Sequence, residues 1–354
     1  MIMVFLPPVL TGGMIVHLFW PDRAGWALFL KTFLGIGIGL GFWSLLYFLY
    51  MLLFAGQHWF SVIQWMIFLG LLTITIWNER KHGWGSLESW KLLRPTRMQA
   101  VLMGFSGIIF LVSLSSTASY LLRRKQGDWD AWMMFNRAAR FVYRDPANWL
   151  DSFSHQMDPI FHADYPLLLA MNVASGWDLV GGETPHVPMV LSALFALACA
   201  GLMVGALAAV KSVGQAALGL IVLWGIPLVV NEGSREMADL PLAFFILGTG
   251  ILIYLFTLHR KPGLIALVGL SAGLAAWTKN EGSLFVIAAA LALLIAFFRE
   301  KPLRILSWYG MGLAFKAIKE GAKEGDKELM KPFADKLSDD EIKALVAYMH
   351  TLKK

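Results

Sequence analysis

Two carboxylates stand two residues apart in segment 127–132, which reads GDWDAW and follows a long apolar run. Carboxylates just outside a membrane helix can serve as a general base or bind a divalent metal such as Mg²⁺ or Mn²⁺. A solvated helix cap followed by tryptophan anchors in the membrane interface explains the same pattern. Asp130 and Asp128 are therefore candidate catalytic and metal-binding residues, with a structural cap as the alternative.

Three arginines follow this segment at helical spacing. Arg137, Arg140 and Arg144 fall at positions i, i+3 and i+7, opposite an apolar stripe. This pattern predicts an amphipathic helix that lies in the membrane interface with its basic face toward lipid phosphates. Simple anchoring without selectivity for a ligand is the alternative. We include Arg137 and Arg140 among the candidate substrate-binding residues.

A histidine and a third carboxylate, His162 and Asp164, precede the apolar run that begins after Pro166. They can orient a sugar hydroxyl or complete a metal shell, and a polar loop before a membrane helix is the alternative. One histidine and one aspartate are too few ligands for a closed zinc site. Cys199 is the only cysteine, which excludes a disulfide framework and a thiolate metal cluster.

Two short polar turns interrupt apolar runs further along the chain, at 231–239 and 278–282. Charged residues at the edge of a bilayer are costly and are usually functional or paired. Lys279 can hold a phosphate, or it can pair with a carboxylate from 128–130 or from the first turn. The candidate substrate-binding residues in the two turns are Arg235, Glu236, Lys279 and Glu281.

The elements that carry these residues are strongly apolar. Of 354 residues, 57% are hydrophobic and 15% are charged, whereas a soluble domain carries about 25% charged residues. This composition excludes a cytosolic globular enzyme, a disordered tail protein and a nucleic-acid-binding protein. About nine apolar runs are long enough to cross a bilayer, which predicts an all-α, polytopic integral membrane protein. These runs lie near residues 2–20, 26–54, 59–77, 99–122, 188–210, 214–230, 239–258, 263–278 and 283–298.

The basic residues of the short connections predict the orientation in an inner cell membrane, because cytoplasmic loops are enriched in Lys and Arg. Most of them fall on one side, which leaves segment 123–187 and the turns 231–238 and 279–282 on the outer face. A basic cluster at 123–125 breaks the rule, but it opens a long loop, where the rule holds poorly. Carboxylates, arginines and a lysine thus meet at one membrane face, which suits a lipid-anchored phosphate donor and a hydroxyl acceptor.

The glycines Gly35, Gly37, Gly39 and Gly41 alternate within the second apolar run. A nucleotide-binding loop would need a preceding strand, and the sequence indicates none there. Small residues let membrane helices approach closely, so the run predicts close helix packing.

Composition changes sharply near residue 310. Residues 311–354 hold nine Lys and eight acidic residues, and a capping box at 338–341 opens an amphipathic helix. This predicts a soluble helical tail on the cytoplasmic side. The predicted domains are N-terminal membrane helices with a cytoplasmic loop (1–98), a membrane body with the outer loop 123–187 (99–308), and the tail (309–354).

Four motifs in this order resemble bacterial glycosyltransferases of the GT-C fold, in particular the group related to protein O-mannosyltransferases and aminoarabinose transferases. Residues 127–144 and 162–169 (HADYPLLL) resemble the first outer loop of that family. Residues 237–245 (MADLPLAFF) and 273–282 (GLAAWTKNEG) resemble two later signatures. The resemblance covers about residues 99–305.

The resemblance implies a multi-helix membrane enzyme that takes a sugar from a polyprenyl-phosphate donor. In such enzymes an acidic residue of the first outer loop is the catalytic base or a metal ligand. Asp130 matches this position best and Asp128 is second, while Asp164 matches a further loop carboxylate. Lys279 lies where a cation near the lipid phosphate would be useful.

The tail resembles a different family. Residues 330–348 are similar to the C-terminal end of a small class I c-type cytochrome, in which Met330 matches the axial haem ligand. The Cys-x-x-Cys-His attachment motif is absent, so no haem cofactor is expected. Members of the GT-C family continue through further membrane helices, whereas the match here stops near Arg304. We interpret the chain as two joined gene fragments, and a natural fusion that lost its haem is the alternative.

These features predict a membrane glycosyltransferase that moves a sugar from a polyprenyl-phosphate donor to a hydroxyl acceptor (a lipid, glycan or protein) on the outer face. Asp130 would deprotonate the acceptor, or position a metal that does. Lys279, with an arginine of the interfacial helix, would stabilise the leaving phosphate. A truncated, inactive body is one alternative. The others are a transporter or lipid-linked glycan flippase, and a membrane-tethered electron carrier suggested only by the tail.

Overall fold

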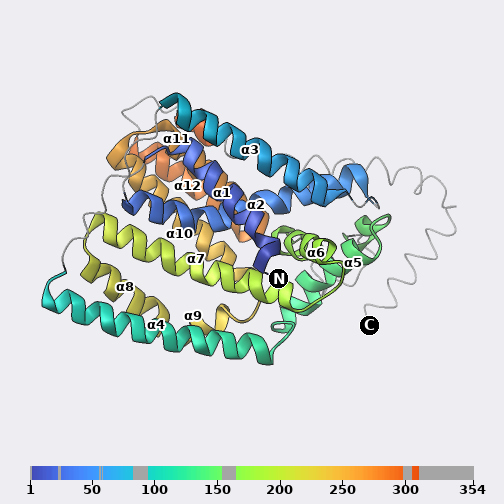
Figure 1. The fold of residues 1–354 in the computed structure, drawn as a ribbon, viewed down its shortest axis with the longest axis horizontal. Helices are drawn as coiled ribbons and strands as arrows, with labels where there is room; N and C mark the ends of the chain where they lie inside the picture. Colours follow the sequence, from blue (N-terminus) through green and yellow to red (C-terminus); the bar gives the residue numbers. More distant parts are fainter. Residues whose placement is uncertain are drawn as a thin grey trace, which may run out of the picture. The chain divides into compact units, whose positions relative to one another are not determined.

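The protein is helical throughout the part of the chain that the computed structural model describes (Figure 1). No strand is present in these residues, as the predicted all-α fold class requires. The first of two compact units ends at residue 313, and the predicted tail at 309–354 lies almost entirely outside the described residues. The described residues are 2–22, 25–55, 57, 59–82, 95–153, 165–297 and 305–310.

A helix occupies the position of each of the nine predicted apolar runs. Five of these helices, α2, α3, α4, α7 and α10, are long and apolar enough to cross a membrane by length and composition, and the other four are shorter. A crossing by each of the nine therefore stays a prediction. The nine helices are α1 (Ile2–Phe19), α2 (Gly25–Phe54), α3 (Phe60–His82), α4 (Arg97–Arg123), α7 (His186–Val210), α8 (Val213–Gly225), α10 (Asp239–His259), α11 (Pro262–Thr278) and α12 (Glu281–Ala296).

The predicted run 214–230 is two helices rather than one. Helix α8 ends at Gly225, and the short helix α9 (Pro227–Glu232) follows after Ile226, whose backbone is extended. Proline disfavours a helical conformation in the residue before it but suits the first turn of a helix. Pro227 therefore breaks the run.

The helix predicted to carry Arg137, Arg140 and Arg144 is present in the outer loop 123–187, and the loop also contains structure that the sequence did not indicate. It holds a π-helix η1 (Ala131–Phe135), α5 (Asn136–Arg144), a 3₁₀-helix η2 (Trp149–Phe153) and α6 (Leu168–Val180). Residues 168–177 of α6 are all buried, and α6 packs against α5, α2 and α7. This part of the predicted loop is thus an internal helix of the bundle.

The glycines of α2 explain its central place in the fold. A Cβ atom on Gly35 or Gly39 would collide with the backbone of α1, and one on Gly37 or Gly41 would collide with Phe244 or Leu274, on α10 and α11. Gly35 and Gly39, four residues apart, thus lie on the helix face that packs against α1. Gly37 and Gly41 lie on the face that packs against α10 and α11. Close packing, predicted from the glycine run, is confirmed.

We expect Gly39→Ala to destabilise the protein by about 1–3 kcal/mol or more, the usual cost of overpacking. The new Cβ would meet the Pro8 carbonyl oxygen, which is backbone and cannot rotate away. The matched control is Gly250→Ala on α10, where a Cβ meets nothing within 4 Å. Unfolding free energies of the two variants in detergent micelles check this, and equal values would contradict it.

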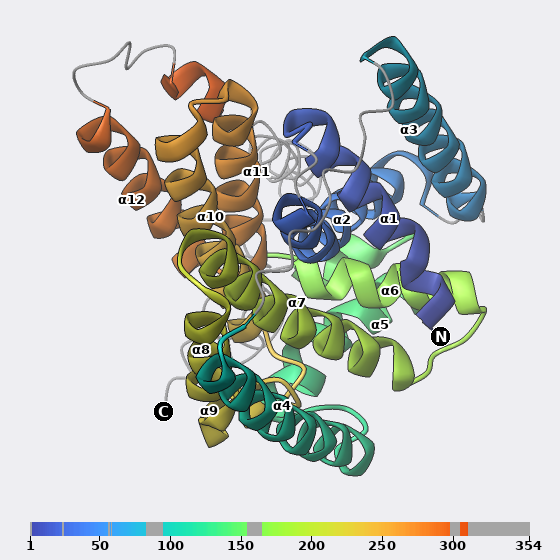
Figure 2. The same ribbon diagram turned by 60° about the vertical axis from the view of Figure 1, so that its left-hand side comes forward.

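Helices α3 and α4 expose most of their apolar side chains. In α2, 72% of the apolar window is buried inside the protein, against 11% in α3 and 17% in α4. Figure 2 shows α3 and α4 at separate edges of the helix group. Apolar faces of this extent are rare on soluble monomers and are expected where helices face lipid. The apolar helices therefore indicate a membrane protein.

Candidate functional site

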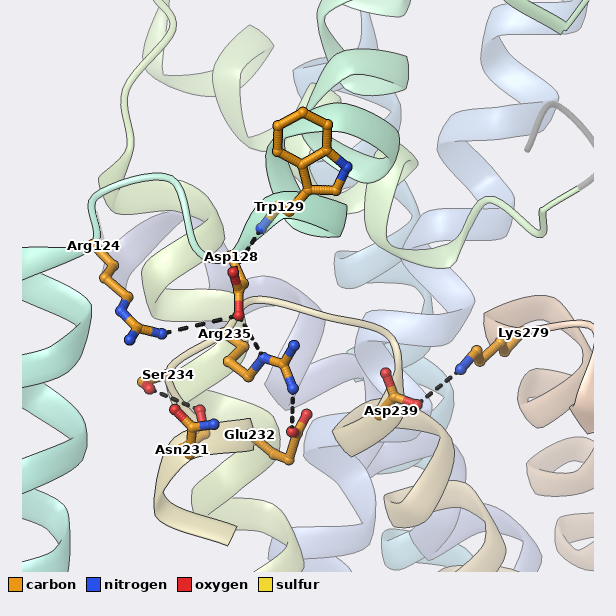
Figure 3. A network of polar contacts seen from close by, with 9 residues as sticks. All are labelled: Arg124, Asp128, Trp129, Asn231, Glu232, Ser234, Arg235, Asp239 and Lys279. Carbon is orange, nitrogen blue, oxygen red and sulfur yellow. Dashed lines mark hydrogen bonds and ion pairs between the residues drawn. The ribbon is translucent and has the colours of Figure 1, made fainter. Parts of the chain in front are cut away.

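Two polar segments that are far apart in the sequence meet beside η1 (Figure 3). The backbone N–H of Asp128, in the α4–η1 turn, donates to the carbonyl oxygen of Arg235, in the α9–α10 loop, at 3.1 Å. Gly127 has a φ of 71°, and a Cβ there would collide with the same carbonyl. The turn thus needs glycine both for its backbone conformation and for this close approach.

Gly127→Ala is expected to separate the two segments and to destabilise the protein more than Gly181→Ala. Both glycines have positive φ values, so both variants carry backbone strain of about 1–2 kcal/mol. Only at residue 127 does the new Cβ also meet other atoms, since nothing lies within 4 Å at residue 181. Thermal unfolding of both variants measures the difference, and an equal loss would show that the contact has no effect on stability.

Asp128 is held by cations and by the backbone. Its Oδ2 accepts a hydrogen bond from Arg235 Nε at 2.9 Å and lies 3.9 Å from Arg124 Nη1. Its Oδ1 accepts from the backbone N–H of Trp129 at 2.8 Å. The Trp129 bond, followed by the Arg235 and Arg124 charges, holds the pKa of Asp128 below its usual value. Arg235 Nη1 also donates to Glu232 at 2.6 Å.

Asp130 lies in a different environment two residues later. It precedes η1 with a half-buried side chain, and no hydrogen bond or ion pair joins its carboxylate to any described residue. Trp129 and Trp132 on either side of it are exposed, with their rings 5.0 Å apart in a T-shaped arrangement. Of the two neighbouring carboxylates, Asp130 is the one available to receive a proton or a ligand.

The pair fits a divalent metal poorly. Both oxygens of Asp128 are already bonded, and two guanidinium groups lie beside it, where they would repel a cation. Within the described ranges, no group of three His, Cys, Asp or Glu residues could hold a metal ion. A Mg²⁺ or Mn²⁺ site at Asp128 and Asp130 therefore stays a sequence prediction, and the mechanism below uses no metal.

Lys279, at the end of α11, forms an ion pair with Asp239, the first residue of α10. Its Nζ lies 2.8 Å from Asp239 Oδ1 and 3.6 Å from Glu281 Oε1. Burial alone would lower the pKa of Lys279, but the hydrogen bond and charge of Asp239 outweigh burial and raise it. Of the alternatives that the sequence left open, the structure places Lys279 with a carboxylate of the 231–239 turn.

The arginines of α5 contact other groups of the protein, although the Arg144 side chain is 64% exposed. Arg140 and Arg144 both form ion pairs with Glu183, in the α6–α7 turn, and the Arg137 guanidinium lies over the Phe141 ring at 5.8 Å. The Arg144 hydrogen bond lowers the pKa of Glu183. Glu183 was not among the predicted site residues. Its position as the one acidic residue of a glycine-containing turn was the only signal.

Glu236 is buried, and one polar neighbour, the Asn136 side chain, is close enough to favour the charged form without meeting hydrogen-bond geometry. The residue is 5% exposed, and neither carboxylate oxygen accepts a hydrogen bond from a residue that the structure describes. Its backbone is left-handed, with a φ of 58°. Burial raises the pKa of Glu236 to about 8, and the neighbouring Asn136 side chain offsets only part of this effect. The sequence identified Glu236 as a candidate without indicating that it is buried.

Three predicted residues, His162, Asp164 and Met330, lie outside the described residues. No protein-family model, curated protein or solved structure matches this chain. The resemblance to GT-C glycosyltransferases therefore rests on the four sequence motifs alone.

Proposed function

We propose that the protein transfers a sugar from a polyprenyl-phosphate donor to a hydroxyl acceptor at the outer face of the membrane. The proposal is carried by the difference in bonding between two carboxylates, those of Asp128 and Asp130, which lie two residues apart beside the Arg235 cation. Asp128 is bonded to Arg235, whereas Asp130 is available. One carboxylate thus orders the site and the other can accept a proton.

In the proposed reaction, Asp130 is the general base. The acceptor hydroxyl gives its proton to the Asp130 carboxylate while its oxygen forms a bond to the anomeric carbon of the sugar. The bond from that carbon to the phosphate oxygen breaks, and its electron pair stays on the phosphate. A base positioned in this way typically contributes about 10²–10⁴-fold to the rate.

The cations of the site would stabilise the departing phosphate. Arg235 uses Nε and Nη1 in its ion pairs, and a guanidinium offers five N–H donors, so further donors are available for phosphate oxygens. Lys279 has three donors and two carboxylate neighbours. Donors that are held in place before the reaction stabilise developing charge without reorganisation.

The test is transfer by the purified full chain in lipid nanodiscs. A polyprenyl-phosphate sugar with a radiolabelled sugar is mixed with membrane lipids as hydroxyl acceptors, and labelled products are separated by chromatography. A new labelled glycolipid supports the proposal. Movement of the intact donor between leaflets in liposomes, with no new bond, would replace it by the flippase alternative.

A further inference from the structure

The α9–α10 loop places another carboxyl group, that of Glu236, near the turn that carries Asp128 and Asp130. Unlike theirs, its surroundings are buried. Glu236 lies at the wall of a small cavity that has room for about one water molecule. The cavity is lined by η1, α5, α6, α7 and the start of α10, and its polar lining residues besides Glu236 are Asn136 and Ser192. The Ser192 hydroxyl donates to the Gly233 carbonyl at 2.9 Å, so its hydrogen is already used.

Charged side chains occur on several elements around this cavity, but none forms an ion pair with Glu236 in the described part of the chain. An isolated buried charge is costly, and such a group usually becomes neutral. A neutral carboxyl group has one O–H donor, and no described residue is bonded to it. The charged residues are Arg124, Asp128 and Asp130 before η1, Arg137 and Arg140 on α5, Glu232 at the end of α9, Arg235 in the same loop as Glu236, and Asp239 at the start of α10.

The backbone conformation at Glu236 and the packing around it hold its carboxyl group in place. A left-handed φ costs a non-glycine residue roughly 1–2 kcal/mol, and such conformations persist only where the surroundings enforce them. A Cβ on Gly127 would approach the Glu236 Cβ within 2.9 Å, so the turn that carries Asp128 and Asp130 packs directly on Glu236. The carboxyl group is therefore held next to the proposed catalytic turn.

We propose that Glu236 is the proton donor of the site and that its cavity receives one oxygen of a phosphate group. This inference rests on the proposed function. The Glu236 O–H would give its proton to the phosphate oxygen as the bond between that oxygen and the sugar carbon breaks, and the resulting carboxylate would regain a proton from water. Asp130 would take the proton of the acceptor hydroxyl and then release it to water, so both carboxyl groups return to their starting forms and the overall reaction is balanced.

The two carboxyl groups would then divide the roles of acid and base by environment. A group with a pKa of about 8 holds its proton at neutral pH, as a general acid must, whereas Asp130, the proposed base, is half-buried and has no hydrogen bond from any described residue. Two features suit this division. The walls of the cavity are mostly apolar, which favours a neutral Glu236. An ionised Glu236 would also repel a phosphate that binds there with Arg235 nearby.

The first experiment needs no turnover. Infrared spectra of the full chain in nanodiscs are recorded with and without a polyprenyl phosphate, and with inorganic phosphate as a second arm. We expect the carbonyl band of a neutral carboxyl group at pH 7, absent from Glu236→Gln, and a shift of this band with the lipid phosphate. No such band, or no shift with either phosphate, would overturn the inference. A shift with inorganic phosphate alone would overturn the assignment to a lipid headgroup.

The second experiment measures transfer. Glu236→Gln keeps an N–H donor but has no proton to give, so kcat should fall by about 10²–10⁴-fold with KM nearly unchanged. The fall in wild-type activity above about pH 8 should be absent from the variant. Full activity of Glu236→Gln would overturn the inference. If the wild type shows no transfer at all, the proposed function fails, whereas the infrared shift would still identify Glu236 as a phosphate-binding acid.

Discussion

Asp130→Asn is expected to lower glycosyl transfer by about 10²–10⁴-fold, the usual contribution of a positioned general base. Asparagine has nearly the same shape but cannot accept the acceptor proton. Because no described side chain is bonded to Asp130, the substitution removes no contact that stabilises the fold. Membrane insertion and unfolding temperature should therefore stay at wild-type values while kcat falls.

Two other aspartates serve as comparisons for this experiment. Asp145→Asn changes an exposed carboxylate that bonds Asn148 in the loop after α5, and it should leave activity unchanged. Asp128→Asn removes the ion pair with Arg235, so it should loosen the contact between the two loops and reduce stability as well as activity. Near-full turnover by Asp130→Asn, or a loss that only mirrors unfolding, would remove Asp130 from the role of base.

The membrane helices were predictable because they depend on composition over a long stretch. A run of apolar residues forms a helix in a bilayer whatever lies next to it, since every backbone group must be bonded within the segment. Each of the nine runs therefore contains a helix, although Pro227 divides the run 214–230 into two helices. The close packing at Gly39 was predictable for a related reason, because alternating small residues in such a run have few roles other than close packing.

The interior of segment 123–187 could not be predicted in the same way. Helix α6 is 13 residues long, too short to indicate a membrane span, and its burial depends in part on α2, which is remote in sequence. The π-helix η1 and the pairing of Arg140 with Glu183 likewise depend on tertiary packing. The sequence identified which residues have useful chemistry, but it did not indicate which of them are paired.

Asp128, Asp130 and Glu236 show this limit most clearly. In the sequence they are three acidic residues in polar turns, and nothing distinguishes a carboxylate that binds arginine from one that is available or one that is buried. These differences arise only when the turn after α4 packs on the loop before α10. The resulting differences in burial and bonding separate the proposed roles, so the chemistry depends on the contact between the two segments more than on any single motif.

Glu236→Gln is expected to change the pH dependence of stability in a direction opposite to that of an ordinary surface carboxylate. The folded-state pKa of about 8 exceeds the usual value of 4.5. Between these values the folded protein holds a proton that the unfolded chain releases, so wild-type stability falls as pH rises through this range. One pKa unit corresponds to about 1.4 kcal/mol, so the whole effect is on the order of a few kcal/mol.

The glutamine variant cannot ionise and should escape this loss. Its unfolding free energy in detergent should be close to that of the wild type at pH 4.5 and clearly higher at pH 8.5. Glu183→Gln is the control with the opposite sign, because Arg144 lowers the pKa of Glu183, and the stability that this pair contributes is lost as pH falls below the usual range. Parallel curves for wild type and Glu236→Gln from pH 4.5 to 8.5 would mean that Glu236 is ionised in the folded protein, and a proton donor at this position would then be ruled out.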